Sequence, residues 1–159
     1  MAHRALNVNM DKGIYILGLG NMGKYVGYAL MNSRNQQHMK TQLHDLFPPV
    51  TLLFHRPGLV ADWENAGSRI SYTSELASER QPTTDELSRP ARVASATRFR
   101  TELIGTPTTE SEPVAIKHLI VATKTHATTA ALASIKHRLS KDSHVMFLQN
   151  GMGMSLTVP

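Results

Sequence analysis

Short apolar runs and a helical repeat alternate along the first third of the chain. Gly13–Gly18 and Val50–Phe54 are almost continuously apolar, as expected of strands that are buried on both faces of a parallel sheet. Between them, an apolar residue recurs at every fourth position from Met22 to Leu30, which predicts a helix over residues 21 to about 32. This part of the chain therefore reads as strand, helix, strand.

The same alternation returns near the end of the sequence. His118–Lys124 and Val145–Leu148 predict a third and a fourth buried strand. A helix is expected between them, with the basic residues at its C-terminal end placed where the helix dipole favours positive charge. The inward face of this helix consists of Thr128, Ala131, Ile135 and Leu139. The basic residues are Lys136, His137, Arg138 and Lys141. Strands that alternate with helices predict an α/β fold, a Rossmann-type, doubly wound and mostly parallel sheet.

The middle of the chain has a different pattern. Arg69–Thr73 and Thr97–Ile104 alternate polar and apolar residues, which predicts two half-exposed strands forming an antiparallel pair. Residues 76–96 contain prolines and charges but few large apolar side chains, so we expect a mobile loop there.

Composition narrows the classes of function. The 159 residues carry 17 basic and 12 acidic side chains, a net charge of +5 that favours an anionic partner. The absence of cysteine excludes disulfides and thiolate metal sites, and the eight histidines lack zinc-ligand spacing, so no metal is expected. Dispersed basic residues with 6% aromatics argue against nucleic-acid binding. No apolar run is long enough for a membrane span. We expect a cytoplasmic protein, with the mitochondrion as the alternative.

A glycine motif supplies the first specific chemistry. The run Gly18-Leu19-Gly20-Asn21-Met22-Gly23 is G-x-G-x-x-G, placed directly after a predicted strand and before a predicted helix. In this context the first glycine allows a tight turn, the second lets the backbone approach a pyrophosphate, and the third lets helix and strand pack closely. The helix N-terminus then offers N–H groups to the phosphates. A tight turn without a ligand is the alternative.

Three further residues are expected at the same edge of the sheet. The second strand ends in His55-Arg56 with no acidic residue before Asp62, which favours NADP(H), because arginine can hold the 2′-phosphate that a carboxylate would repel. A solvated loop arginine is the alternative. Lys124 ends the third strand and Asn150 follows the fourth, so both are expected in the ligand crevice.

These residues resemble a known family. The Gly18–Gly23 loop, Arg56, Lys124-Thr-His-Ala127 and Gln149-Asn-Gly-Met-Gly153 are similar to the N-terminal NADP-binding domain of ketopantoate reductases (2-dehydropantoate 2-reductases), within the 6-phosphogluconate-dehydrogenase-like group. The resemblance covers roughly residues 13–57 and 114–155.

The resemblance implies an activity and its residues. It implies that the glycine loop and Arg56 bind NADPH, that Lys124 contacts the cofactor, and that Asn150 contacts cofactor and substrate. The implied reaction is hydride transfer from NADPH to the ketone of ketopantoate, which gives pantoate for pantothenate biosynthesis. In the family, the catalytic lysine and a substrate-binding glutamate belong to a helical C-terminal domain. We expect that domain to be absent from this chain.

The expected organisation is an N-terminal extension at 1–12, a dinucleotide-binding domain at 13–155 and a truncated end at 156–159. We therefore expect cofactor binding without useful turnover, and reduction of a small 2-keto acid only after completion by a second domain. A non-catalytic nucleotide-binding or regulatory module is the alternative, favoured by Ala127, where the family often has glutamine. Another dehydrogenase of the same group, acting on a different acid, is a third. The uncovered last strand predicts a homodimer.

Overall fold

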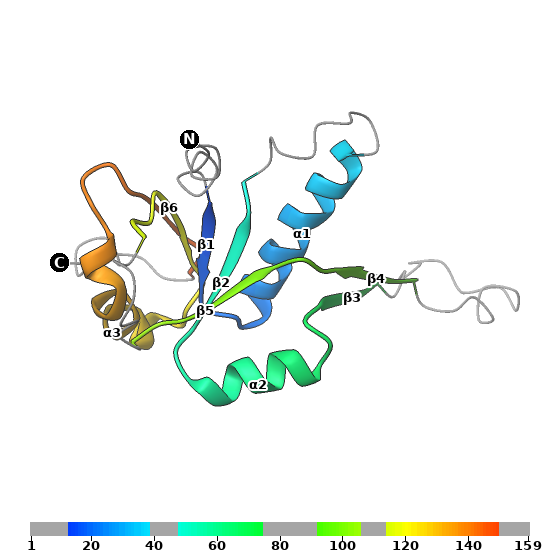
Figure 1. Cartoon of the computed structure of the whole chain (residues 1–159), viewed down its shortest axis with the longest axis horizontal. Coiled ribbons are helices and arrows are strands. Elements are labelled where there is room, and N and C mark those ends of the chain that lie inside the picture. Colours follow the sequence, from blue (N-terminus) through cyan, green and yellow to red (C-terminus); the bar gives the residue numbers. More distant parts are fainter. Residues whose placement is uncertain (1–12, 39–47, 75–91, 106–113, 150–159) are drawn as a thin grey trace, which may run out of the picture.

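The computed structural model describes residues 13–38, 48–74, 92–105 and 114–149 (Figure 1). The predicted extension at 1–12, the end at 156–159, Asn150 and most of the predicted mobile loop lie outside these residues. The chain forms β1 (Ile14–Leu17), α1 (Asn21–His38), β2 (Val50–Phe54), α2 (Pro57–Asn65), β3 (Ile70–Ser74), β4 (Arg92–Ala96), β5 (Arg100–Leu103), β6 (His118–Val121), α3 (Thr125–Ile135), the 3₁₀ helix η2 (Lys136–Arg138) and β7 (His144–Phe147).

The main sheet confirms the predicted doubly wound α/β fold. Its strand order is β5-β2-β1-β6-β7, and every neighbouring pair is parallel. The strand order runs in opposite directions on the two sides of β1, and the connections after β1 and β6 lead to helices on opposite faces of the sheet. The loops at the carboxyl ends of these two neighbouring strands therefore separate, and ligands bind in the crevice between such loops.

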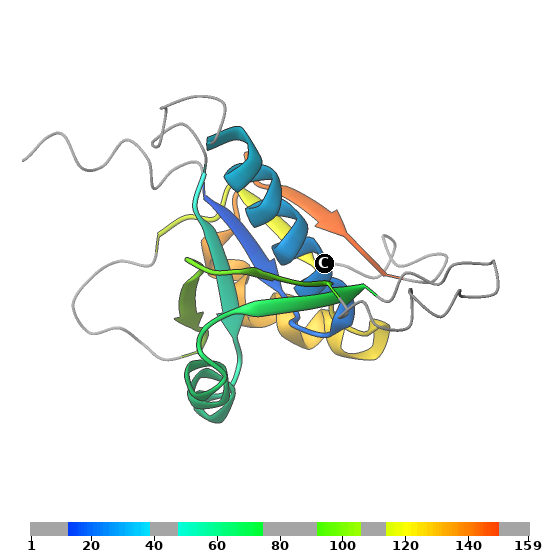
Figure 2. The ribbon, with the colours of Figure 1, turned by 90° about the vertical axis from the view of Figure 1, so that its right-hand side faces the viewer.

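Helices cover both faces of this sheet, and each face has its own core. Figures 1 and 2 show α1 on one side of the strands and α3 on the other. Ile16 and Leu52 pack with Met31 of α1, whereas Leu17 and Leu53 pack with Leu132 and other residues of the α3 face. Successive strand residues therefore point into opposite cores, which explains why β1 and β2 read as continuous apolar runs.

The prediction that residues 69–73 pair with residues 97–104 is wrong. β3 pairs with β4, so residues 92–96 of the predicted mobile loop form a strand, with Ile70 and Ala96 as a buried pair. β5 instead joins the main sheet parallel to β2. Since α2 makes the crossover from β2, β5 can lie beside β2 in the parallel sense. The β3–β4 arm extends away from the sheet (Figure 1).

The helices differ in length from those that the apolar pattern predicts. α3 ends at Ile135 and passes into η2, so Leu139 lies beyond it in extended backbone instead of on its inward face. α1 continues to His38 rather than ending near Asn32, because no glycine or proline follows Leu30 until Pro48. α2 was not predicted at all, although Pro57 stands at its start, where the fixed φ of proline suits a helix. Leu59, Val60 and Trp63 of this helix pack on the α1-side core.

The fourth predicted strand is present as β7, but it is not buried. Met146 is 57% exposed and Val145 36%. β7 is the last strand on its side of the sheet, and no described helix lies over the surface that Met146 presents. Only Phe147 packs against the α3-side core.

Arg138 does more than complement a helix dipole. Its side chain is 5% exposed and forms an ion pair with the Glu102 carboxylate on β5, while its Nε donates to the Val114 carbonyl at 2.9 Å. The guanidinium also lies 5.4 Å from the ring centroid of Tyr15. Burial raises the pKa of the Tyr15 phenol above its ordinary value, and the nearby Arg138 cation opposes this shift only in part. Arg138 thus ties η2 to β5 and β1.

We predict that Arg138→Ala destabilises the domain, because it leaves Glu102 and the Val114 carbonyl without their cationic donor. Removing one partner of a buried pair costs about 3–5 kcal/mol, and the 38% exposure of Glu102 places this pair at or below the lower limit. Urea unfolding followed by circular dichroism measures the change. Lys141→Ala, an exposed charge removal nearby, is the control. Equal midpoints for wild type and Arg138→Ala would contradict a stabilising role.

Candidate functional site

The glycine loop is held between β1, β6 and the start of α1. Gly18 has φ of +99°, a conformation that favours glycine. A Cβ at Gly18 would lie 2.7 Å from the backbone of Ala122 and Thr123, just after β6. A Cβ at Gly23 would lie 1.9 Å from the carbonyl oxygen of Gly18. Both positions therefore require glycine for backbone-to-backbone packing.

Gly20 is different, because nothing lies within 4 Å of the position that its Cβ would occupy. The loop is thus tightly packed at Gly18 and Gly23, and open at Gly20. This is the distribution of space that a dinucleotide requires, with the second glycine giving the pyrophosphate access to the backbone. α1 starts at Asn21 and has no acidic residue in its first turn, so nothing there neutralises its positive end.

A cleft of ≈ 1390 Å³ opens from this loop along the carboxyl edge of the sheet. One part of it is bounded by the ends of β2 and β6 and by α3, with small side chains such as Ala127, Ala130 and Ala131 on the helix. The other part is bounded by α1, α2 and β3. Ligand clefts in proteins are commonly about 300–1,000 Å³, so this space is sufficient for a dinucleotide.

The charged groups that line the cleft favour an anion. Lys24, Arg69 and Lys124 contribute three cations, and Asp62 contributes one carboxylate. All four are exposed, so their fields act on a ligand arriving from solvent.

Lys124 was expected at this edge, and it lies in the lining of the cleft as the N-cap residue of α3. Arg56 is the N-cap residue of α2; it is exposed directly after β2, and it is not among the residues that line the cleft. Its neighbour His55 does line the cleft, as does Asp62 one turn into α2. The position of Asn150 lies outside the described residues, which end at Gln149.

A hydrogen-bonded group behind the cleft was not recognised in the sequence. The Gln149 amide donates to the Thr123 carbonyl at 2.8 Å, to the Thr123 hydroxyl at 3.1 Å and to the Thr128 hydroxyl. Thr128 also donates to the Lys124 carbonyl at 3.1 Å. We call these groups the strand-end network. Thr128 fits the apolar face of α3 by its spacing, and only its complete burial next to Gln149 indicates a polar role.

Aromatic side chains line the part of the cleft between α1, α2 and β3. Tyr72 lies 5.5 Å from Tyr28 and 6.1 Å from Tyr25, measured between ring centroids. Trp63 of α2 lies 5.8 Å from Phe99 in an edge-to-face arrangement. Since Trp63 is the single tryptophan of the chain and lines the cleft, its fluorescence can report on a ligand there.

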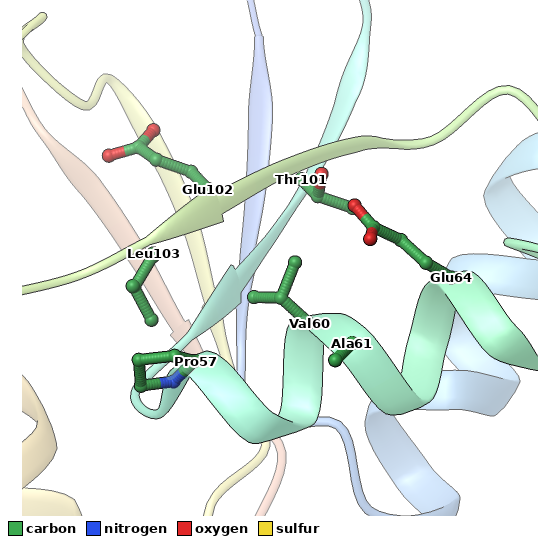
Figure 3. A pocket seen from close by; sticks show the side chains of 7 residues that line it. All are labelled: Pro57, Val60, Ala61, Glu64, Thr101, Glu102 and Leu103. Atoms are coloured by element: carbon green, nitrogen blue, oxygen red, sulfur yellow. The ribbon is translucent and has the colours of Figure 1, made fainter.

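A smaller cavity of ≈ 290 Å³ lies between α2 and β5 (Figure 3). Figure 3 shows Leu103 directed toward α2 and Glu102 directed away from it. Because Glu102 pairs with Arg138, only Glu64 adds a carboxylate that this cavity could use. The cavity lacks the convergent polar groups of the larger cleft.

Neither a metal cluster nor a membrane-spanning helix is present among the described residues. The described segments hold no group of three or more His, Asp or Glu side chains placed to share a metal ion. Among residues 13–38, 48–74, 92–105 and 114–149, no helix combines the length and hydropathy that a membrane crossing requires.

The fold and the cleft define a dinucleotide-binding domain of the Rossmann type. The family model described as ketopantoate reductase PanE/ApbA matches residues 14–158, so the chain belongs to this family. The family is one of reductases, so the chain is an oxidoreductase-like domain. Comparison with curated proteins finds no match.

The fold is also similar to a solved structure, described as the ternary structure of D-mandelate dehydrogenase with NADH and anilino(oxo)acetate. The TM-score is 0.53 at 18% sequence identity, and the match covers 92% of this chain. The chain spans 37% of the length of that dehydrogenase.

Alanine at two glycines should separate ligand access from folding. We predict that Gly20→Ala leaves the melting temperature nearly unchanged but weakens dinucleotide binding by about tenfold or more, because its Cβ enters the space above the loop. Gly23→Ala should destabilise the fold by about 1–3 kcal/mol, because its Cβ meets the Gly18 carbonyl. Thermal unfolding and nucleotide titration measure both. Normal affinity in Gly20→Ala would argue against a ligand at this loop.

Proposed function

We propose that this domain binds NADPH for the reduction of a 2-keto acid, with ketopantoate as the substrate that the family membership favours. The observation that carries the proposal is the glycine loop, which is closely packed at Gly18 and Gly23 and open at Gly20. The bound cofactor supplies the hydride. The residues of this domain bind the dinucleotide and hold its nicotinamide end at the carboxyl edge of the sheet.

The preference for NADPH over NADH rests on the charges after β2. The strand ends in His55 and Arg56, and no carboxylate stands at the position that usually holds the ribose hydroxyls of NAD. Arg56 is exposed at the start of α2, so its guanidinium is accessible to a phosphate without being withdrawn from a core. A forked, charge-assisted contact to the 2′-phosphate would then select NADPH.

Lys124 is assigned to the cofactor rather than to proton transfer. It is the N-cap residue of α3 and lines the cleft beside Thr123, where its ammonium can neutralise phosphate charge. Asn150 follows Gln149 in the sequence, and we propose that it contacts the cofactor and the keto acid. The proton donor for the alkoxide that forms on hydride transfer is not assigned to any residue of this domain.

Titration with NADPH and NADH, followed through Trp63, tests the proposal. NADPH absorbs where tryptophan emits, so binding should quench Trp63 and produce sensitised nicotinamide emission. We predict tighter binding of NADPH than of NADH. Arg56→Ala should weaken NADPH by about 10- to 100-fold and leave NADH nearly unchanged, because the charge-assisted contact is made only to the 2′-phosphate.

Arg100→Ala is the matched control, since it removes an exposed arginine at the opposite, amino-terminal end of β5. It should change neither affinity. Equal affinity for the two nucleotides would remove the NADPH assignment, and absence of binding by either would remove the cofactor assignment altogether. Binding of NADPH by a protein that never reduces a 2-keto acid would favour the non-catalytic module.

A further inference from the structure

The strand-end network connects three segments of backbone that meet at the cleft. Thr123 follows β6, Thr128 lies in the first turns of α3, and Gln149 lies just beyond β7. Thr128 is completely buried, whereas Lys124, which lies between the two threonines in sequence, is exposed to the cleft. The network is therefore placed behind the turn that presents Lys124.

One arrangement of the hydrogens is consistent with every acceptor in this network. A carbonyl oxygen only accepts, so the Thr128 hydroxyl hydrogen goes to the Lys124 carbonyl. The Thr123 hydroxyl, 3.0 Å from that of Thr128, must then donate to it. Gln149 must present its NH₂ group to the Thr123 carbonyl, and the same group reaches both hydroxyls. Each member thus fixes the orientation of the next, in the order Gln149, Thr123, Thr128, Lys124.

The carbonyl at the end of this chain also accepts from the Ala127 N–H at 2.9 Å, in the first turn of α3. The Lys124 backbone is therefore held both by the helix that it caps and by a buried hydroxyl. Among the described residues, Lys124 in this strand-to-helix turn is the lysine that lines the α3 side of the cleft.

We infer that Thr128 and Gln149 are positioning residues that direct Lys124 at the phosphates of the bound dinucleotide. Neither needs to touch the cofactor. The inference rests on the proposed function, because it assigns how one of the proposed ligands is held. Loss of either side chain would let the turn relax, and the Lys124 ammonium would lose its fixed approach to the phosphates.

The test is NADPH affinity, measured through Trp63 at a temperature at which every variant is folded. Thr128→Val keeps the shape of the side chain and removes the hydroxyl, and it should weaken NADPH binding about tenfold. Thr128→Ser restores the hydroxyl and should restore the affinity. Gln149→Met should act like Thr128→Val, and it replaces that variant if Thr128→Val does not fold.

Ser143→Ala is the matched structural control. The Ser143 hydroxyl donates to the Ile116 carbonyl at 2.6 Å, a similar tie between the β6 and β7 segments at the opposite edge of the sheet. It should lower the melting temperature without changing NADPH affinity. If Ser143→Ala weakens binding as much as Thr128→Val, the effect is general destabilisation and the inference is overturned.

A double-mutant cycle tests whether Thr128 affects NADPH affinity through Lys124. If Thr128 acts by positioning Lys124, Thr128→Val should have little further effect in a Lys124→Ala protein, whereas fully additive losses would overturn the inference. Failure of the wild type to bind NADPH would overturn the proposed function and this inference together. Normal NADPH binding by the wild type and by Thr128→Val would overturn this inference alone.

Discussion

The close approach of the glycine loop to β6 is the constraint on which the rest of the structure depends. Gly18 is in contact with the backbone that follows β6, and Gly23 is in contact with Gly18. Because a side chain at either position would separate them, these two contacts bring α1, β1 and β6 to one point. The open space above Gly20 and the N-terminus of α1 are consequences of that packing.

The polar groups in and around the cleft are of two kinds, exposed cations and hydrogen-bonded side chains. Lys24, Arg69 and Lys124 are exposed, and their positive charges face the cleft. Thr128 and Gln149 lie behind the cleft in a network that is buried at Thr128, and they can only hold the backbone in place. Such a division is physically reasonable, because hydrogen bonds to backbone carbonyls restrain Thr128 and the Gln149 amide nitrogen, whereas exposed cations contribute long-range attraction.

The sequence predicted the parts of the fold that local pattern determines. β1, β2, β6 and the G-x-G-x-x-G turn follow from apolar runs and glycine spacing, and all four are confirmed. β3 pairs with β4, and β5 pairs with β2. The alternation of polar and apolar residues predicts that each segment is a strand, but it carries no information about which distant strand is the partner. The burial of Arg138 was missed for the same reason, since Glu102 is 36 positions away. Arg56 and Asn150 remain predictions.

The most direct measurement is the change in backbone amide chemical shifts when NADPH is added to the ¹⁵N-labelled protein. We predict that the largest changes fall on Gly18–Gly23 and on Thr123–Ala127, with small changes at the amino-terminal edge near His118 and His144. Changes concentrated at that opposite edge, or none at saturating NADPH, would contradict a dinucleotide site at the glycine loop.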